Sequence, residues 1–274
     1  MRVTATEARN RFGSFCARAC RAALLVLLAV NPQALAQDMI RIPAGPFTMG
    51  SNDGRDDERP AHAVTLAAFE IDRLQVTNAE FARFLDRHGA IDPDGRRYFD
   101  WDDGDARIRR VDGAWRADPG FEDHPVVEAS WLGALAYCRS LGKRLPTEAE
   151  WEKAARGTDA RRYPWGDAVP TAAHARFASG WNDTVAVSAH AAHASAYGVV
   201  GMAGNAWHWV SSAYRPYPYR DDDGREDSSP GPVRATRGGG HDSSAEALRT
   251  TERGRTLSRA PAAGHHNIGF RCAR

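Results

Sequence analysis

Hydrophobic residues recur at helical spacing behind a capping residue in three separate stretches of the chain. In the clearest of them, Thr147 and Glu150 have the spacing of a capping box, and Trp151, Ala154 and Ala155 follow on one face. A glycine ends each stretch, as is typical of helix C-termini. We therefore expect three helices, which begin after Thr77, Ser130 and Thr147 and end at Gly89, Gly142 and Gly157.

The remaining hydrophobic pattern is that of short strands. Residues 39–51 alternate apolar residues with Pro and Gly, which predicts two strands around a turn, and residues 64–71 alternate again. Three short helices among many strands and loops favour an α+β fold over a parallel βαβ sheet. The stretch 91–122 is the least regular. It is either a long surface excursion pinned by its aromatic residues or one wall of a binding cleft.

The first 36 residues have the organisation of a signal peptide. Two arginines precede the apolar run 22–30, and residues 34–36 (Ala-Leu-Ala) form a small-x-small cleavage site. The run is too short to span a bilayer as a helix, although a short membrane anchor is the alternative. We expect residues 1–36 to be removed, the mature chain 37–274 to be periplasmic or secreted, and no stable membrane span after cleavage.

Removal of this segment changes the charge balance. The chain of 274 residues has 36 basic and 35 acidic residues, a formal net charge of +1. Residues 1–36 hold five Arg and one Glu, so the mature chain has 31 basic and 34 acidic residues and a net charge of −3. No basic stripe follows, so nucleic acid is not expected as a partner.

Two cysteines, Cys138 and Cys272, stay in the mature chain. An even pair in an exported protein favours a disulfide. Such a bond would close a loop of 134 residues, worth about 4–5 kcal/mol in the chain-entropy model. Cys138 falls on the apolar face of the expected helix with Trp131, Leu135 and Leu141, and so would be buried. The alternative is a pair of reactive thiols in a metal site.

Several strings of the sequence carry a family resemblance: RLPTEAEWEKAARG with the YPWG that follows it, VTNAEFARFL, and RGG with the later IGFRC. The sequence resembles the formylglycine-generating enzyme family, also called sulfatase-modifying factors, over residues 39–274. The resemblance implies one domain, 37–274, with the formylglycine-generating-enzyme variant of the C-type lectin-like fold and little regular secondary structure. It also implies a bond between Cys138 and Cys272, because the family often bridges these positions.

The site implied by the resemblance has lost its key side chains. Formylglycine generators carry two cysteines after RGG whose thiolates bind copper(I), and those positions hold Ser243 and Leu248 here. The family's active-site serine corresponds to Gly240. A hydroxyl and an isobutyl group cannot replace soft thiolate ligands. Copper is therefore not expected as a cofactor.

The family's calcium frame is degraded as well. The resemblance implies calcium held by Asn205 with an Asp or Asn at the position of Gly201, and by an upstream Asn at the position of Arg176. Calcium takes six to eight oxygen ligands, which Gly201 and Arg176 do not supply as side chains. We do not expect this frame to hold calcium, and Asn205 is alternatively a turn-capping residue. The family's usual Glu is replaced by His208.

Polar residues stand where the thiols are missing. We predict His241, Asp242 and Ser243 as catalytic candidates. Two His and one carboxylate suit iron(II), so a metal site could form from His241, His265 and Glu246, with the identity of any cofactor left open. The expected ligand pocket is lined by Arg237, Trp207, His265 and His266, with the three His side chains in one pocket. The alternative is that these polar loop residues only bond backbone groups.

The resemblance leaves more than one function open, since the same fold also serves ergothioneine synthases, a periplasmic siderophore-maturation protein and ligand-binding receptors. We expect an exported, oxidoreductase-like member that acts on a peptide or a small exported metabolite without the two-cysteine copper route. The first alternative is a non-catalytic module that binds a peptide or small molecule. The second is a sulfatase-maturation role retained by another chemistry.

Overall fold

In the computed structural model of the chain, residues 38–254 and 261–274 are described, and the expected leader lies outside them. No helix of this described part is long and apolar enough to cross a membrane. The elements in chain order are β1 (Met39–Ile42), β2 (Gly45–Met49), η2 (Asp56–Glu58), β3 (His62–Leu66), β4 (Phe69–Asp72), α1 (Asn78–His88), β5 (Ile108–Val111), β6 (Ala114–Ala117), α2 (Trp131–Ser140), α3 (Glu148–Arg156), η3 (Ala191–His193), β7 (Trp207–Ala213), β8 (Arg234–Arg237), η4 (Ala245–Leu248) and β9 (Ile268–Phe270).

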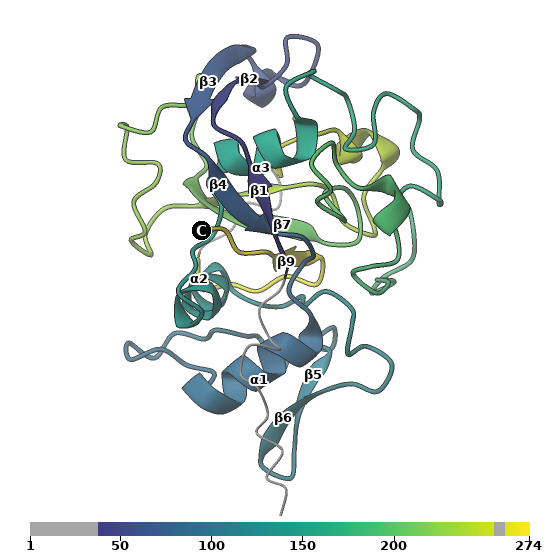
Figure 1. The fold of residues 1–274 in the computed structure, drawn as a ribbon. Coiled ribbons are helices and arrows are strands. Elements are labelled where there is room, and N and C mark those ends of the chain that lie inside the picture. The colour runs from purple at the N-terminus through teal and green to yellow at the C-terminus, as the bar shows by residue number, and fades with distance from the viewer. Residues whose placement is uncertain (1–37, 255–260) are drawn as a thin grey trace, which may run out of the picture. The chain divides into compact units, whose positions relative to one another are not determined.

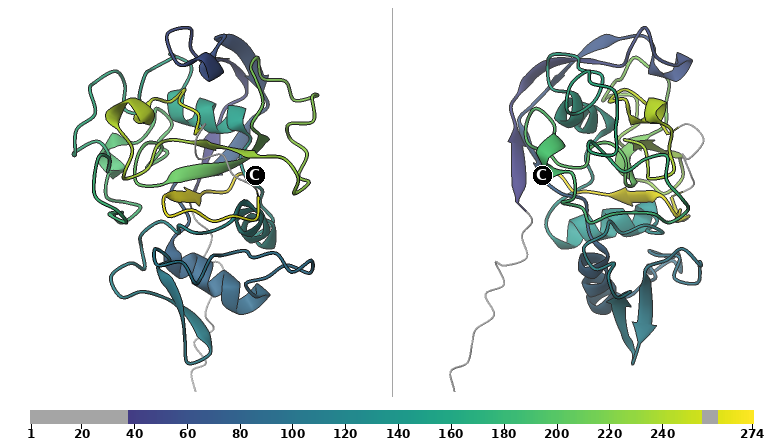
Figure 2. Two further views of the ribbon diagram at one scale, coloured as in Figure 1. Left: turned by 180° about the vertical axis from the view of Figure 1, so that it is seen from behind. Right: turned by 90° about the vertical axis from the view of Figure 1, so that its right-hand side faces the viewer.

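The strands form small sheets rather than one large one. Antiparallel pairs join β1 to β4, β2 to β3 and β5 to β6. The central sheet has the order β8-β7-β9, in which β7 is antiparallel to β8 and parallel to β9. Figures 1 and 2 show this sheet between the β2–β3 hairpin at one end of the domain and α1 with the β5–β6 hairpin at the other. The α+β expectation with little regular secondary structure is confirmed.

The helix ends lie where the capping residues predicted them. The Thr147 side chain accepts a hydrogen bond from the Glu150 backbone N–H, and the Glu150 carboxylate accepts one from the Thr147 N–H at 2.9 Å. Thr77 and Glu80 form the same reciprocal pair at α1, whereas Ser130 caps α2 only by accepting from the Gly133 N–H. One detail is wrong: Leu141 was expected on the buried face, but α2 ends at Ser140 and Leu141 is 45% exposed.

The largest hydrophobic core lies between α1, α2 and the central sheet. It contains the side chains that the apolar faces predicted, including Trp131 and Cys138 of α2 and Phe81 of α1. The disulfide joins Cys138 to Cys272, with the two Cα atoms 5.6 Å apart. The bond fastens α2 to the segment that follows β9, as both the cysteine count and the family resemblance predicted.

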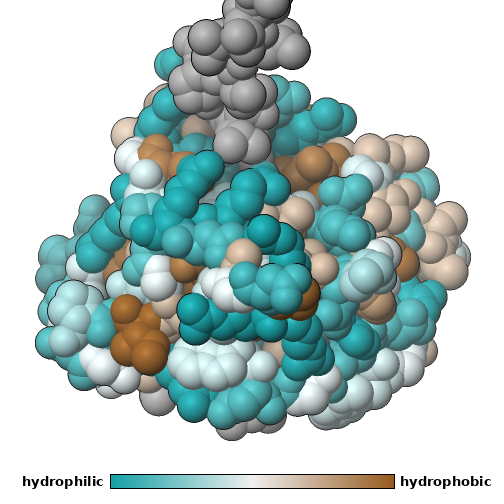
Figure 3. Space-filling view, turned by 90° about the horizontal axis from the view of Figure 1, so that it is seen from below, coloured by the Kyte–Doolittle hydropathy of each residue, from teal (hydrophilic) through white to brown (hydrophobic). Residues whose placement is uncertain are grey.

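The irregular stretch 91–122 is anchored by aromatic contacts. Trp115 lies edge-on to the fully buried Phe99, with ring centroids 6.4 Å apart, and Trp101 lies 6.0 Å from Trp115. The β5–β6 hairpin of this stretch packs on α1. Seen from this end, the surface is predominantly hydrophilic with scattered hydrophobic side chains (Figure 3). These contacts fit a surface excursion pinned by its aromatic residues. Trp101 and Trp115 also line a pocket of about 660 Å³ beside α1, as the cleft-wall alternative expected.

Candidate functional site

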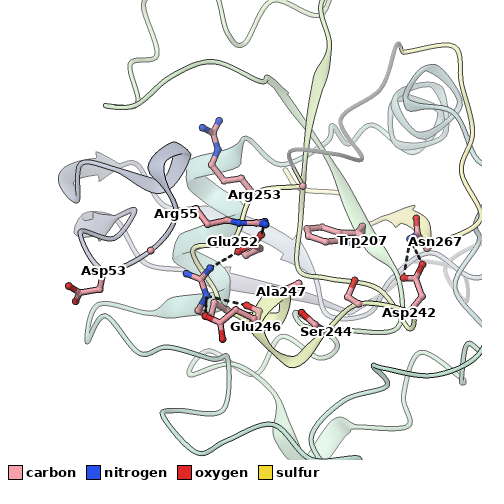
Figure 4. A pocket seen from close by; sticks show the side chains of 14 residues that line it. Asp53, Arg55, Trp207, Asp242, Ser244, Glu246, Ala247, Glu252, Arg253 and Asn267 are labelled. Atoms are coloured by element: carbon pink, nitrogen blue, oxygen red, sulfur yellow. Dashed lines mark hydrogen bonds and ion pairs between the residues drawn. The ribbon is translucent and has the colours of Figure 1, made fainter.

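A pocket of about 480 Å³ opens beside the loop that follows β8. Trp207 at the start of β7, Asp242 and Ser243 on this loop, and Asn267 before β9 form one side of it. Figure 4 shows Asp53 and Arg55 across from them. The pocket therefore lies on the loop where the resemblance placed the family's reaction site.

Asp242 is a fixed, ionised carboxylate at the edge of this pocket. It accepts hydrogen bonds from Asn267 Nδ2 at 2.9 and 3.0 Å, and His266 Nε2 lies 3.1 Å from its Oδ2 atom. Burial alone would raise the pKa of the Asp242 carboxyl, but the hydrogen bonds from His266 and Asn267 outweigh it and hold the pKa at about 2. Asp242 can bind a cationic or N–H donor group of a ligand without first losing a proton.

Trp207 forms an apolar wall of the pocket with one unused donor. Its side chain is buried, and its indole Nε1–H has no hydrogen-bond partner within the described residues. A Cβ atom at Gly240 would lie 3.1 Å from both Trp207 Cδ1 and Asp242 Oδ1. The loop therefore leaves little room for a side chain at Gly240, the position where the resemblance places a serine.

The predicted catalytic residues His241, Asp242 and Ser243 are not arranged as a serine nucleophile next to a histidine base. The Ser243 hydroxyl accepts a hydrogen bond from the Gly240 N–H at 2.9 Å, which closes a tight turn. His241 is fully buried; its Nδ1 lies 3.1 Å from the Asn205 carbonyl oxygen, and its Nε2 has no partner in the described part of the chain. Burial lowers the pKa of His241. Activation of Ser243 by His241 is not supported by these contacts.

The three predicted histidines do lie together. The His266 ring centroid is 6.1 Å from that of His241 and 4.5 Å from that of His265. The indole of Trp181 stacks on His266 at 3.8 Å. None of the three histidines lines the pocket, which Asp242 separates from His266. They form a layer behind the pocket rather than its surface.

The predicted iron ligands do not converge. The Glu246 carboxylate lies at the pocket edge and pairs with Arg162 and Arg249, at 3.2 Å in each case. His265 Nδ1 lies 2.7 Å from Asn267 Oδ1. Across residues 38–254 and 261–274, no set of three ligand atoms from His241, His265 and Glu246 comes within 4.8 Å. The residues present do not fit the iron site that the sequence suggested.

The residues at the calcium positions implied by the resemblance make contacts within the protein. The Asn205 side chain bonds both backbone groups of Val185, with Oδ1 accepting and Nδ2 donating at 2.9 Å. Arg271 Nη2 donates to the carbonyl of Gly201 at 3.2 Å, and the Arg176 guanidinium pairs with Asp183. The Asn205 side chain therefore fastens the segment around Val185, and these bonds do not cap the turn between Gly204 and Trp207 that the alternative expected.

Arg237 is a structural residue, which corrects its prediction as a pocket residue. Its guanidinium is fully buried and pairs with Glu148 at 3.1 Å and Glu152 at 2.6 Å, both on α3 and both buried. It also donates to the Thr250 carbonyl oxygen at 2.7 Å. Arg253 completes the cluster by bonding Glu148 at 2.7 Å.

Sequence reasoning missed the far side of the pocket. Arg55 pairs with Glu252, and both line the pocket with Arg249 and Arg253. The segment 52–59 gave no signal beyond its charge. Glu252, the partner of Arg55, lies 197 residues away in the sequence, so no local pattern could have linked these two side chains.

The fold and the pocket together define a domain of the formylglycine-generating-enzyme variant of the C-type lectin-like fold. Residues 27–274 match the family described as "Sulfatase-modifying factor enzyme 1-like domain". The chain belongs to this family.

Several relatives of known name are similar to the chain. It is 35% identical to the formylglycine-generating enzyme of Streptomyces coelicolor, over 89% of this chain and 91% of that protein. It is 34% identical to the hercynine oxygenase of Mycolicibacterium smegmatis, over 67% of this chain and 47% of that protein. It is 38% identical to the serine/threonine-protein kinase Pkn1 of Chlamydia trachomatis, over 89% of this chain but about two-fifths of that protein (39%).

Among solved structures, PvdO from Pseudomonas aeruginosa is similar in fold and sequence, with a TM-score of 0.65 and 29% identity over 87% of this chain and 94% of that one. CarF is similar in fold, with a TM-score of 0.60 at 19% identity over 88% and 98% of the two chains.

Proposed function

We propose that this chain is an exported, oxidoreductase-like domain that acts on a peptide or a small exported metabolite in the pocket beside Trp207 and Asp242. The observation that carries the proposal is the pocket's position. It lies on the loop after β8, where formylglycine generators carry their reactive thiols, in a chain 35% identical to one of them. Export rests on the signal-peptide pattern of residues 1–36.

The chemistry at this position differs from the two-cysteine route. Ser243 lines the pocket in place of one thiol, and Leu248, in place of the other, is fully buried. Both cysteines of the described residues are joined in the disulfide. These residues do not fit copper(I), which prefers soft thiolate ligands, so no step is assigned to that metal.

The pocket's own side chains favour a ligand with an amine or amide group next to an apolar part. The ionised Asp242 accepts from N–H donors, and the indole face of Trp207 supplies an apolar surface beside it. Across the pocket, the charge of Arg55 is neutralised by Glu252. A backbone segment of a peptide or an amino-acid-derived metabolite has this combination of groups.

The test is an oxidation assay with a matched pocket variant. The protein is incubated in air with an extract of exported peptides and metabolites, and mass spectrometry and an oxygen electrode record the products. We expect oxygen uptake and a new oxidised mass that Asp242→Asn reduces at least about ten-fold, since the carboxylate charge is lost and its size is kept. Asp222→Asn, at an exposed carboxylate outside the pocket, is the control.

A specific observation favours a second candidate, the non-catalytic binding module. In the described part of the chain, no thiol and no set of three ligand atoms from His241, His265 and Glu246 is available for redox chemistry at the pocket. This candidate predicts that ligands from the same extract bind with an Asp242-dependent thermal shift but return unchanged. It also predicts no stoichiometric iron or copper in protein purified without a His tag.

A further inference from the structure

Three carboxylates converge at a place away from the pocket. Asp103 and Asp105 lie on the loop before β5, and Glu128 lies just before α2. Each offers one oxygen, and these oxygens all lie within 4.8 Å of one another. Two more acids of the loop lie outside the cluster: Asp100 accepts from the Gly264 N–H at 2.8 Å, and Asp102 pairs with Arg97 at 2.5 Å.

Glu128 is the unusual member of this cluster. Its side chain is only 3% exposed, yet its carboxylate has no hydrogen bond or ion pair with any described residue. The backbone holds it in place, since its N–H donates to the His265 carbonyl oxygen and its own carbonyl accepts from the Asp100 N–H, both at 3.0 Å. A buried carboxylate without a partner is costly unless a cation or a proton compensates it.

The electrostatics agree with the geometry. Burial, followed by the charges of Asp103, Asp100 and Asp105, raises the pKa of Glu128 to about 8. Arg109 reaches only the backbone carbonyl oxygens of this loop, such as that of Asp103 at 3.4 Å, and forms its ion pair with Asp118 instead. No cationic side chain of the described residues neutralises the three carboxylates.

We propose that Asp103, Asp105 and Glu128 form a binding site for Ca²⁺. All the donors are carboxylate oxygens, which a hard cation prefers and which suit Zn²⁺ or copper(I) poorly. Two oxygens on opposite sides of Ca²⁺ are about 4.8 Å apart at a typical Ca–O distance of about 2.4 Å, so the cluster can close on one ion. Mg²⁺ needs shorter contacts in a near-ideal octahedron. Water would supply the remaining ligands.

The site does not include Asn205, and it borders the three histidines behind the pocket. Both carboxylate oxygens of Asp105 accept from Trp181 Nε1 at 2.8 Å, and Asn182 Nδ2 donates to Oδ1 at 2.5 Å. Trp181 in turn stacks on His266, which contacts Asp242 of the pocket. An ion at Asp105 would therefore tie the loop before β5 to the layer behind the pocket.

The direct test is calcium titration of the protein after chelator treatment. Isothermal titration calorimetry measures Ca²⁺ binding, with Mg²⁺ as the competing ion. Tb³⁺, which replaces Ca²⁺ in oxygen sites, provides a second signal. The indole of Trp181 donates a hydrogen bond to Asp105, so it can transfer excitation energy to a Tb³⁺ ion bound there. We expect one saturable site and terbium emission that Ca²⁺ abolishes.

Three variants locate the ion. Glu128→Gln and Asp103→Asn each remove one charge and keep the side-chain size, and each should weaken Ca²⁺ binding at least about ten-fold, since affinity follows the number of ligand charges. Asp102→Asn is the matched control, because this acid lies in the same loop but is 62% exposed and outside the cluster. It should change the affinity less than about two-fold.

Two results would overturn the proposal. One is the absence of saturable Ca²⁺ binding up to about 1 mM, the weak end of extracellular calcium sites. The other is calcium binding that Asp103→Asn and Glu128→Gln leave unchanged, which would place the ion elsewhere. Circular dichroism checks that the variants fold. If Glu128→Gln unfolds, the exposed Asp103 decides the outcome, because its replacement does not disturb the core.

Discussion

Replacement of Arg237 by methionine separates a structural from a ligand-binding role for this residue. Its guanidinium forms ion pairs with Glu148 and Glu152 of α3 and donates to the Thr250 carbonyl oxygen. The side chains of Arg237 and both glutamates are fully buried. Methionine fills much of the same volume but carries no charge. The substitution therefore leaves the packing largely intact and removes the partner of two buried carboxylates.

The expected loss follows from the contacts that stay. Glu148 keeps its two bonds to Arg253, at 2.7 and 3.0 Å. Glu152 loses its 2.6 Å partner and keeps only the Gly50 N–H at 2.7 Å and Arg156 at 3.3 Å. One buried carboxylate is thus left undercompensated, a change that costs about 3–5 kcal/mol in comparable buried pairs. This loss is a large fraction of the free energy of unfolding of an ordinary domain, which is about 5–15 kcal/mol.

The assay is equilibrium unfolding in urea, followed by tryptophan fluorescence, to which Trp151, 5.2 Å from the Arg237 guanidinium, contributes as one of eight tryptophans. Addition of Glu152→Gln to Arg237→Met should restore at least half of the loss, since the uncompensated charge is then gone. Arg220→Met, which removes an exposed ion pair with Asp222, should have no measurable effect. A loss below about 1 kcal/mol together with abolished ligand binding would refute this reasoning and return Arg237 to the binding site.

Three further predictions concern the core, the disulfide and the lost chemistry. Burial and the nearby Arg271 hold the pKa of His208 well below its usual range of about 6.5, so stability is fully present above pH 6.5 and decreases as the pH falls. His208→Gln should make this decrease shallower between pH 7.5 and pH 5 (about two and a half units), and parallel stability curves would contradict the assignment. Cys138 and Cys272 should resist alkylation until a reductant is added, and labelling of the native protein without reductant would argue against the bond. With copper and a reductant, the protein should leave the thiol of a Cys-x-Pro-x-Arg peptide unchanged, whereas an aldehyde product by mass spectrometry would revive the sulfatase-maturation alternative.

Local sequence patterns determined the helices and the disulfide. The capping boxes at Thr77 and Thr147 act within four residues, so their geometry is nearly independent of the rest of the fold. The bond between Cys138 and Cys272 followed from the cysteine count and the family resemblance, and α2 confirms the buried position of Cys138. The family resemblance, and no local pattern, pointed to the loop after β8 as the place of the pocket.

The tertiary structure alone decided the roles of the charged residues. Glu148 and Glu152 look solvent-facing in the sequence of α3, yet both are fully buried because Arg237 and Arg253 reach them from 85 to 105 residues away. Arg237 was expected to line the ligand pocket and Glu246 to bind a metal, whereas Arg237 pairs with two buried glutamates of α3 and Glu246 pairs with two arginines. Only the fold brings Glu128 to an acidic loop more than twenty residues earlier in the chain. Charges act through space, so the sequence names the charged groups, whereas the paths of the loops decide which of them meet.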